Sequence, residues 1–294
     1  MKKSQLKFNC IDLFCGAGGM SAGFVRANFN IVFAVECVSQ YAKTYSINFP
    51  STNVYLGDIK KISNNEILKI GKKHKIDIII GGPPCQGFSL AGNIGRKFLK
   101  DERNKLFLEY VRFVKLIQPS MFVLENVAAL LKHNKGKTIK EIEKKFSEIG
   151  YQIQYKVLNS AHYNVPQIRR RIFIVGCKNN YLFDFPNESK RTITIKEAID
   201  DLPILKSGQT SKVPNHNAMN HSAQMLNKMK FVKDGGNRND IPRKIRPKSG
   251  DMRKYIRYDS SKPAPCVTGD MRKIFHYMLI PCFFICTIIF FNIF

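Results

Sequence analysis

The sequence contains no tryptophan and no C-x-x-C pair, and acidic residues are scarce in it. The eight cysteines are scattered and have no histidine-rich cluster beside them, so they do not match the ligand spacing of a structural zinc site. The N-terminus has no apolar signal-peptide core. We therefore expect a cytoplasmic protein with free thiols, no disulfide and no metal ion.

The shortage of acids gives the chain a strongly positive charge. Lys and Arg number 48 against 22 Asp and Glu, a formal net charge of +26 over 294 residues. Clustered cations gain affinity by releasing counterions from phosphates, so this balance favours nucleic acid as a partner. The alternative is codon bias, because Lys, Asn and Ile are abundant throughout the sequence. Charge alone does not decide between the two interpretations.

Short apolar runs alternate with amphipathic segments over the first 180 residues. Runs rich in β-branched residues with little alternation are typical of strands that are covered on both faces. We predict a doubly wound, mostly parallel α/β sheet in a domain spanning residues 1–184. Its clearest helices are Leu106–Leu116 and Thr138–Ile149, the latter closed by Gly150. The predicted strands are Phe8–Phe14, Ile31–Glu36, Val54–Leu56, Ile76–Ile80, Met121–Glu125, Gln152–Leu158 and Ile172–Gly176.

Beyond residue 185 the sequence becomes polar and is punctuated by Pro and Gly. Residues 185–273 are expected to form a small, irregular, basic region, in which 236–273 hold six Arg and five Lys against four acids. That composition suits a phosphate-contacting groove or a merely solvated loop. Residues 274–294 carry no Asp, Glu, Lys or Arg. They are long enough to span a bilayer, but Pro281 interrupts them and no basic flank follows, so we expect no membrane anchor.

The first candidate site is a glycine-rich turn between a strand and a helix, Asp12-Leu13-Phe14-Cys15-Gly16-Ala17-Gly18-Gly19. Small residues at such a turn let a ligand approach the backbone and the helix N-terminus. Glu36, at the end of the next strand, is placed to accept ribose hydroxyls, and Asp58 and Ile59, at the end of the third, to contact adenine. The complete G-x-G-x-x-G fingerprint is absent, which disfavours an NAD-dependent dehydrogenase.

The second candidate site is Gly81-Gly82-Pro83-Pro84-Cys85-Gln86-Gly87-Phe88-Ser89, directly after an apolar strand. Ligands bind at the carboxyl edge of open α/β sheets, so Cys85 is displayed where a nucleophile could work. The alternative for any cysteine is a small buried thiol. The cysteines in or beside predicted core strands fit that alternative, namely Cys10, Cys15, Cys37 and Cys177.

Two further groups of polar residues flank predicted strands. Glu125-Asn126-Val127 ends an apolar strand, where apolar surroundings raise the pKa of a carboxyl group and suit it to act as an acid; a helix-capping carboxylate is the alternative. Gln167-Ile168-Arg169-Arg170-Arg171 precedes the strand Ile172–Gly176. Its guanidinium groups could orient a base or phosphate, or form a basic surface strand.

In this order and spacing, the motifs over residues 8–176 resemble those of the C5-cytosine DNA methyltransferases of bacterial restriction–modification systems. The Pro-Pro-Cys and Glu-Asn-Val motifs are the specific part of the resemblance, whereas glycine-rich turns occur in many folds. The stretch from Arg257-Tyr258 to Pro265-Cys266-Val267-Thr268 resembles the family segment that supports target recognition.

The resemblance implies a mechanism in which the Cys85 thiolate adds to C6 of a cytosine that is flipped out of the duplex. Glu125 would hydrogen-bond or protonate N3, so that C5 becomes nucleophilic and accepts a methyl group. Loss of the C5 proton would then expel the thiolate. Arg171 would steady the carboxylate or the cytosine O2, with Arg169 nearby.

The resemblance also implies the cofactor S-adenosylmethionine and double-stranded DNA as the partner. The implied cofactor-binding residues are Phe14, Gly16, Ala17, Gly18, Gly19, Glu36, Cys37, Asp58, Ile59, Pro84 and Leu106. Cys37 departs from the aromatic or bulky residue that the family often has beside adenine. The implied DNA-binding residues are Gln86, Ser89, Asn126, Gln167, Arg257 and Thr268.

We further expect a monomer that associates with the bacterial nucleoid through DNA, with any cognate restriction endonuclease encoded separately. After His276-Tyr277 the sequence departs from the family, as in a frameshifted or truncated reading frame, which predicts an unstable or weakly active chain. Two alternatives stay open: an RNA cytosine methyltransferase acting on transfer RNA, and an inactive DNA-binding remnant.

Overall fold

The computed structural model describes residues 8–84, 105–178, 183–247 and 255–266, and these group into two compact units. The first unit comprises residues 8–158 and 170–187, and the second 159–169 and 188–266. The segment 159–169 groups with the second unit although it precedes residue 185 in the sequence. Within the described ranges, no helix is both long and apolar enough to cross a membrane.

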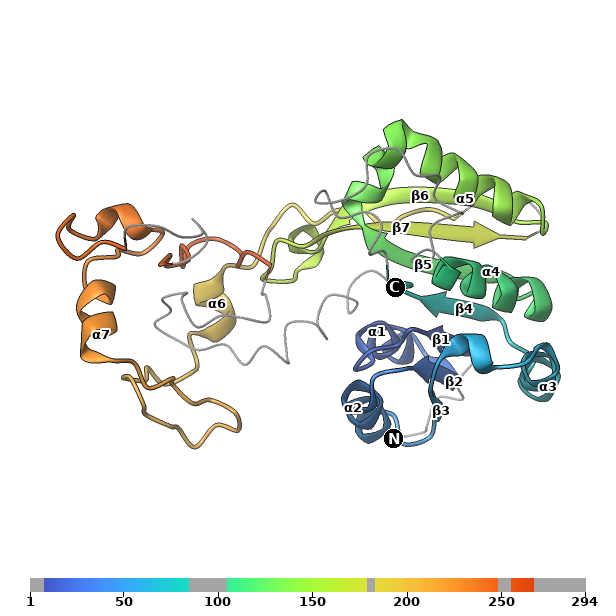
Figure 1. The fold of residues 1–294 in the computed structure, drawn as a ribbon, viewed down its shortest axis with the longest axis horizontal. Helices are drawn as coiled ribbons and strands as arrows, with labels where there is room; N and C mark the ends of the chain where they lie inside the picture. Colours follow the sequence, from blue (N-terminus) through green and yellow to red (C-terminus); the bar gives the residue numbers. More distant parts are fainter. Residues whose placement is uncertain (1–7, 85–104, 179–182, 248–254, 267–294) are drawn as a thin grey trace. The chain divides into compact units, whose positions relative to one another are not determined.

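A seven-stranded sheet forms the centre of the first unit, in the order β3-β2-β1-β4-β5-β7-β6 (Figure 1). Strands β1 to β5 are parallel to one another, whereas β7 runs antiparallel to β5. The order reverses between β1 and β4, which is where open α/β sheets bind ligands. The strands are β1 (Phe8–Leu13), β2 (Phe29–Glu36), β3 (Asn53–Leu56), β4 (Ile78–Gly81), β5 (Met121–Val127), β6 (Gln152–Asn159) and β7 (Arg170–Cys177).

The helices of the first unit follow the strands in alternation. They are α1 (Gly19–Arg26), α2 (Ser39–Asn48), the short 3-10 helix η1 (Ile59–Lys61), α3 (Asn64–His74), α4 (Lys105–Ile117), the kinked 3-10 segment η5 (Ala128–Gly136) and α5 (Lys137–Ser147). A capping box, in which Ser63 and Glu66 each accept the other's backbone N–H, starts α3. Gly150 lies just beyond α5 with a φ of +88°.

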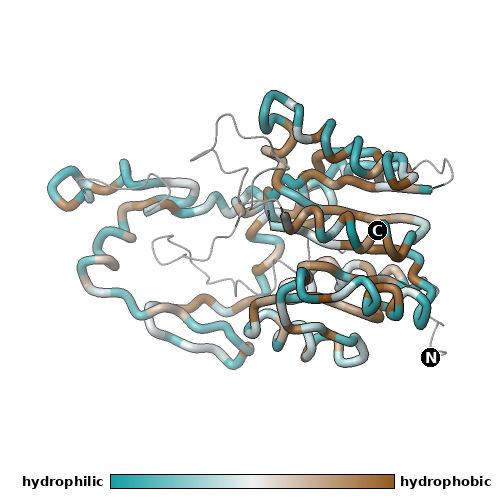
Figure 2. Tube along the Cα trace, turned by 45° about the vertical axis from the view of Figure 1, so that its right-hand side comes forward, coloured by the Kyte–Doolittle hydropathy of each residue, from teal (hydrophilic) through white to brown (hydrophobic). Residues whose placement is uncertain are grey.

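Successive side chains of a strand point to opposite faces of the sheet, and the two faces pack against different helices. Ile11 and Leu13 join the main core with side chains of α3, α4 and α5, whereas Ala34 packs with Cys15 and Tyr45 of α2. Figure 2 shows hydrophobic and hydrophilic stretches alternating along the chain. The doubly wound α/β architecture predicted from the sequence is confirmed, and each of the seven predicted strands is present with small shifts at its ends.

Two local expectations were wrong. Asp58 and Ile59 do not end a strand, because β3 stops at Leu56 and Asp58 instead caps η1 by accepting the backbone N–H of Lys60. Cys37 is exposed, since it lies just past the end of β2, where the chain leaves the sheet. Cys10, Cys15 and Cys177 are buried, as expected.

The second unit has little regular structure. Its helical elements are η6 (Ser160–Tyr163), α6 (Ile195–Ile199), α7 (Ala223–Met229) and η7 (Arg238–Asp240). Two small apolar clusters hold it together. One contains Ile195, Tyr258 and Ala264, and the other is built on Val232 and Ile241.

Phe122 of β5 is the aromatic centre of the main core. Its ring is fully buried, stacks on Phe146 with the ring centroids 4.0 Å apart, and leaves no room for a Cβ atom on Gly176. We predict that Phe122→Ala lowers the free energy of unfolding by about 3–5 kcal/mol, because it opens a cavity that the sheet cannot close. Tyr155→Ala, at a 41% exposed position on β6, should cost less than about 1 kcal/mol. Equal losses in urea unfolding would contradict this account of the core.

Candidate active site

The register of the central strands sets the position of the site. Leu13 of β1 pairs with Gly81 of β4, and Gly81 pairs with Leu124 of β5. The residues that follow each strand therefore leave the sheet at one edge. Glu125 is the next residue on β5, and its Oε2 lies 3.3 Å from the place where a side chain on Gly82 would begin. The glycine-rich turn, the Pro-Pro segment and Glu125 therefore lie next to one another at this edge of the sheet.

The glycine-rich turn uses left-handed backbone at several positions. Phe14, Gly16 and Gly18 have φ angles of +61°, +56° and +93°. A Cβ on Gly18 would lie 2.2 Å from the Phe49 ring, whereas no atom lies within 4 Å of a Cβ on Gly16. Gly18 is thus required by packing, while the open space at Gly16 leaves the backbone accessible to a ligand. Ala17 lies between these two glycines, and Gly19 is the first residue of α1.

Glu36 fastens this turn to the start of α2. Its carboxylate oxygens accept the backbone N–H groups of Gly16 at 2.9 Å and Val38 at 2.8 Å. The side chain is nearly buried. Each carboxylate oxygen has a second lone pair, so Glu36 can hold the turn and still accept hydroxyl groups from a ligand.

The next loop presents Asp58 and Ile59 and is held by a residue that the sequence analysis did not single out. Arg112 of α4 donates to the carbonyl oxygens of Ile59 at 3.1 Å and Ile62 at 2.9 Å. It also pairs with Glu109, one turn earlier on α4. Ile59 is buried, whereas Asp58 lies at the surface. Leu106 of α4 packs against the same core.

A buried carboxylate lies beneath the turn. Asp12 is 1% exposed and accepts a hydrogen bond from Ser21 Oγ at 2.7 Å, and Ser21 Oγ lies 2.6 Å from the Tyr45 hydroxyl. Burial raises the pKa of Asp12 to about 7, with a smaller contribution from the charge of Glu36 and opposed by the hydrogen bond from Ser21. Asp12 belongs to the glycine-rich motif, but no function was predicted for it from the sequence.

Glu125 forms an ion pair at the end of β5. Its Oε1 lies 3.0 Å from Nε of Arg171 on the neighbouring antiparallel strand β7, and both side chains are largely buried. The next residue, Asn126, donates from Nδ2 to the carbonyl of Pro83 at 3.2 Å. Asn126 is itself buried, so it fixes the backbone of the Pro-Pro segment. Exposed Pro84 is the last described residue before Cys85.

Three other predicted site residues lie in the second unit. Arg169 donates to Sγ of Cys266 at 3.5 Å. Gln167 is buried, and its backbone forms an isolated parallel β-bridge with Ala264. Arg257 is 9% exposed and donates to the carbonyl of Val232 at 2.7 Å and to that of Met229 at 3.0 Å. These contacts join distant segments, so Arg257 holds the fold of this unit, and its DNA contact stays a prediction.

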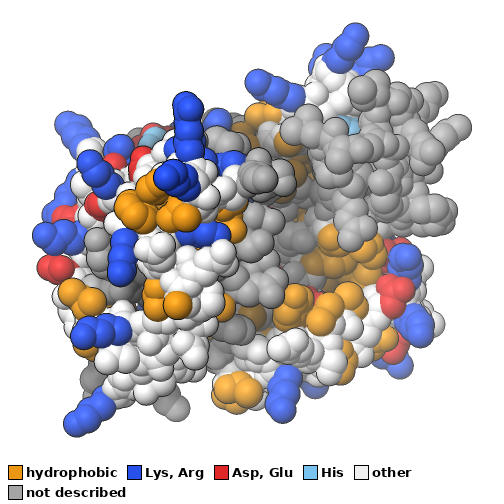
Figure 3. All heavy atoms as spheres, turned by 60° about the vertical axis from the view of Figure 1, so that its left-hand side comes forward, with side chains coloured by type: hydrophobic (Ala, Val, Ile, Leu, Met, Phe, Trp, Pro, Cys, Tyr) orange, Lys and Arg blue, Asp and Glu red, His pale blue; other side chains and the backbone are white. Residues whose placement is uncertain are grey.

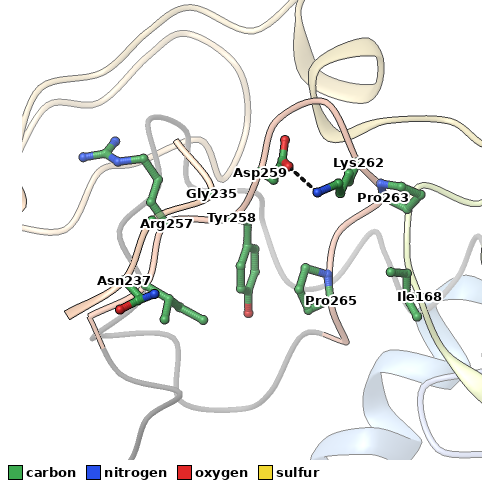
Figure 4. A pocket seen from close by; sticks show the side chains of 11 residues that line it. Ile168, Gly235, Asn237, Arg257, Tyr258, Asp259, Lys262, Pro263 and Pro265 are labelled. Carbon is green, nitrogen blue, oxygen red and sulfur yellow. Dashed lines mark ion pairs between the residues drawn. The ribbon is translucent and has the colours of Figure 1, made fainter. Parts of the chain in front are cut away.

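The second unit also contains a hollow of about 450 Å³ beside Tyr258, Pro263 and Pro265 (Figure 4). The Arg257 side chain points away from it, and an ion pair of 2.7 Å between Asp259 and Lys262 lies at its rim. Cys85, Gln86, Ser89 and Thr268, predicted from the sequence as site residues, lie outside the described residues.

The model of the C-5 cytosine-specific DNA methylase family matches residues 8–273. The chain belongs to this family. A Type II methyltransferase, M1.HphI of Haemophilus parahaemolyticus, is 54% identical over 268 residues, which cover 91% of this chain and 72% of that protein. M.DdeI of Desulfomicrobium norvegicum is 35% identical over 315 residues, covering 91% and 73%. The resemblance inferred from the motifs is confirmed.

Solved structures agree with this placement. A prophage-encoded protein of E. coli, assigned as a DNA modification methyltransferase, superposes with a TM-score of 0.70 at 25% identity, covering 88% of this chain and 82% of that one. DNMT2 of Spodoptera frugiperda, at 23% identity and a TM-score of 0.54, covers 77% and 66% and shares the fold. The protein is thus a DNA cytosine-5 methyltransferase of a family and fold that use S-adenosylmethionine.

The pH dependence of the methyltransferase's stability tests whether the pKa of buried Asp12 is raised. An unfolded Asp has a pKa near 3.8, whereas that of Asp12 is about 7, so between these values only the folded state retains the proton. The free energy of unfolding should therefore fall as the pH rises towards 7, and Asp12 should cause no further fall above that pH. Between about pH 5 and pH 7, the wild-type protein should lose on the order of 2–3 kcal/mol of its free energy of unfolding through Asp12. We predict that this loss is absent in Asp12→Asn, whose side-chain oxygen can still accept the hydrogen bond from Ser21.

Asp201→Asn provides the control, since Asp201 is exposed and the substitution removes the same charge. Urea unfolding at several pH values measures both variants. The same pH dependence in Asp12→Asn and wild type would show that the Asp12 carboxyl does not titrate in this range.

Proposed function

We propose that this methyltransferase acts through a covalent adduct between Cys85 and C6 of a flipped-out cytosine in duplex DNA. The observation that supports the proposal most directly is the register of β1, β4 and β5. It brings the glycine-rich turn, the segment leading to Cys85 and the Glu125–Arg171 pair to one edge of the sheet. A methyl-donor site, a nucleophile and an acid are the groups that the reaction needs together.

Cysteine suits the first step because C5 of cytosine is a weak nucleophile. Addition of the Cys85 thiolate to C6 breaks the C5–C6 double bond and places electron density on C5. After C5 has accepted the methyl group, removal of its proton restores that double bond and releases the thiolate. Sulfur both attacks and leaves readily, whereas a hydroxyl at this position would need stronger activation. A stacked, paired base hides C6, so the cytosine must leave the helix.

Glu125 and Arg171 have complementary functions in this proposal. A carboxyl group facing N3 stabilises the enamine by donating or sharing a proton there. The Arg171 guanidinium, 3.0 Å from Glu125 Oε1, fixes the carboxyl group and can also face the cytosine O2. Arg169 is proposed to lie near the same base. Asn126, by holding the Pro83 carbonyl, keeps the Cys85 segment in position.

The described residues fit S-adenosylmethionine. The open backbone at Gly16, the carboxylate of Glu36, and Asp58 above buried Ile59 offer a nucleoside a cradle, hydroxyl acceptors and an apolar floor. When bound, the cofactor supplies an electrophilic methyl group on a sulfonium centre. The full proposed binding set is Phe14, Gly16, Ala17, Gly18, Gly19, Glu36, Cys37, Asp58, Ile59, Pro84 and Leu106.

We propose residues 1–184 as the catalytic domain and 185–273 as the region that recognises duplex DNA. Net charge supports a phosphate-rich partner, and Lys and Arg outnumber acidic side chains on the face drawn in Figure 3. The Type II relatives support a restriction–modification context, with the endonuclease on a separate chain. In this proposal the enzyme works as a cytoplasmic monomer on the nucleoid.

Trapping tests the covalent step. Fluorine at C5 cannot leave as a proton, so duplex DNA with 5-fluorocytosine at the target position should hold the enzyme in a denaturation-resistant adduct when S-adenosylmethionine is present. We predict that Cys85→Ala abolishes this adduct, whereas Cys177→Ala, which removes a buried thiol of β7, retains it. Adduct formation by Cys85→Ala at the wild-type level would exclude the proposed nucleophile.

A double-mutant cycle tests the ion pair. We predict that Glu125→Gln lowers kcat by about 10²–10⁴-fold, because the N3 proton is no longer supplied. Arg171→Ala should also lower kcat, and the double variant should be less impaired than the product of the single effects, since both act on one group. Arg170→Ala removes an exposed guanidinium from the preceding position of β7 and serves as the control. Independent, multiplicative effects would contradict the coupling.

A further inference from the structure

Residues Lys206–His221, between α6 and α7, double back on themselves as a short two-stranded ribbon (Figure 1). Thr210 and Asn217 form an antiparallel bridge. On either side of it, Ala218 donates to the Gln209 carbonyl at 2.7 Å, and Ser211 donates to the His216 carbonyl at 3.1 Å. The chain therefore has a defined turn here, within an otherwise irregular unit.

Side chains within the ribbon fix the shape of its tip. His216 is completely buried, and its Nδ1 lies 2.9 Å from Ser211 Oγ. The same hydroxyl oxygen accepts the backbone N–H of Val213 at 3.1 Å, and Asn215 turns the chain with a φ of +62°. A tip held in this way loses little conformational entropy when it contacts a partner.

The base of the ribbon is closed in the same manner. Ser207 Oγ donates to the carbonyl of Met219 at 3.2 Å and accepts the backbone N–H of His221 at 2.8 Å. Gln209 Oε1 accepts the backbone N–H of Lys206 at 2.7 Å. These polar groups of the base therefore stabilise the ribbon itself, as Ser211 and His216 do at the tip, whereas Lys212, Asn215 and Asn217 are exposed.

The exposed side chains of the ribbon have the chemistry of base-edge recognition. Residues 202–233 include five lysines and no Asp or Glu. Lys212, Asn215 and Asn217 are exposed around the tip, with Val213 38% exposed between them. Amide side chains match the major-groove edge of adenine, lysine matches guanine, and an apolar group contacts the thymine methyl. A two-stranded ribbon is also narrow enough to enter the major groove.

We propose that the ribbon Lys206–His221 enters the major groove of the target duplex, and that Lys212, Asn215 and Asn217 determine which bases flank the methylated cytosine. The inference rests on the proposed action on duplex DNA and narrows its recognition region to one element. Phosphate contacts elsewhere in the basic chain hold the enzyme on DNA but carry no direct sequence information.

The test uses the full chain and a library of duplexes with randomised sequence. Bound duplexes are sequenced to obtain the preferred site, and S-adenosylmethionine is then added to map the methylated cytosines. We expect Lys212→Ala, Asn215→Ala and Asn217→Ala each to lose discrimination at one or two positions of the site by about tenfold or more. Binding to DNA of unrelated sequence should stay within about twofold for the two asparagine variants, since neither changes the charge.

Matched controls are Lys140→Ala on α5 and Asn65→Ala on α3, which remove the same side chains from exposed positions of the first unit. An unchanged site in all three ribbon variants would overturn the inference, as would a wild-type chain that shows no sequence preference. A uniform loss of binding to every sequence would also overturn it, since phosphate contact or folding would then explain the ribbon. Failure of the proposed chemistry is distinguishable, because it would abolish methylation while the binding preference remained.

Discussion

The active site depends on one packing constraint, the close approach of β1 and β4 at the carboxyl end of the sheet. A Cβ atom on Gly81 would lie 2.4 Å from the carbonyl oxygen of Leu13, so only glycine permits this pairing. The pairing aligns the ends of β1, β4 and β5, and with them the glycine-rich turn, the segment leading to Cys85 and Glu125. Because the three groups come from separate strands, their relative positions follow from the rigidity of the sheet rather than from any single loop.

Two carboxylates stabilise the glycine-rich turn and the residues beneath it in different ways. Glu36 accepts two backbone N–H groups and so defines the shape of the turn. Asp12 lies below the turn with Ser21 and Tyr45, where burial raises its pKa to about 7. A buried acid in a core strand destabilises the folded protein when it is charged. The stability of the folded protein therefore depends on pH through this group.

Much of this architecture could be predicted from the sequence, because β-branched runs such as Ile76–Ile80 mark buried strands and the functional motifs follow them directly. Contacts between distant segments could not be predicted. Nothing in the sequence around Arg112 indicates that it supports the loop after Asp58. The hydrogen bonds that join Asp12 to Ser21 and Ser21 to Tyr45 likewise draw on two different helices, α1 and α2. The ribbon at Lys206–His221 lacks apolar alternation, since hydrogen bonds hold it, and periodicity therefore gave no signal there. Cys37 seemed buried because it adjoins a core strand, but it lies past the strand's end.

The most direct test of the account is a crystal structure of the protein with S-adenosylhomocysteine and a duplex containing 5-fluorocytosine. The account predicts the nucleoside of the ligand against the Phe14–Gly19 turn, with its ribose at Glu36 and its adenine at Asp58 and Ile59. It further predicts a flipped cytosine bonded through C6 to Cys85, with N3 facing Glu125. A ligand bound away from the ends of β1 and β2, or a bonded cytosine whose N3 faces away from Glu125, would contradict it.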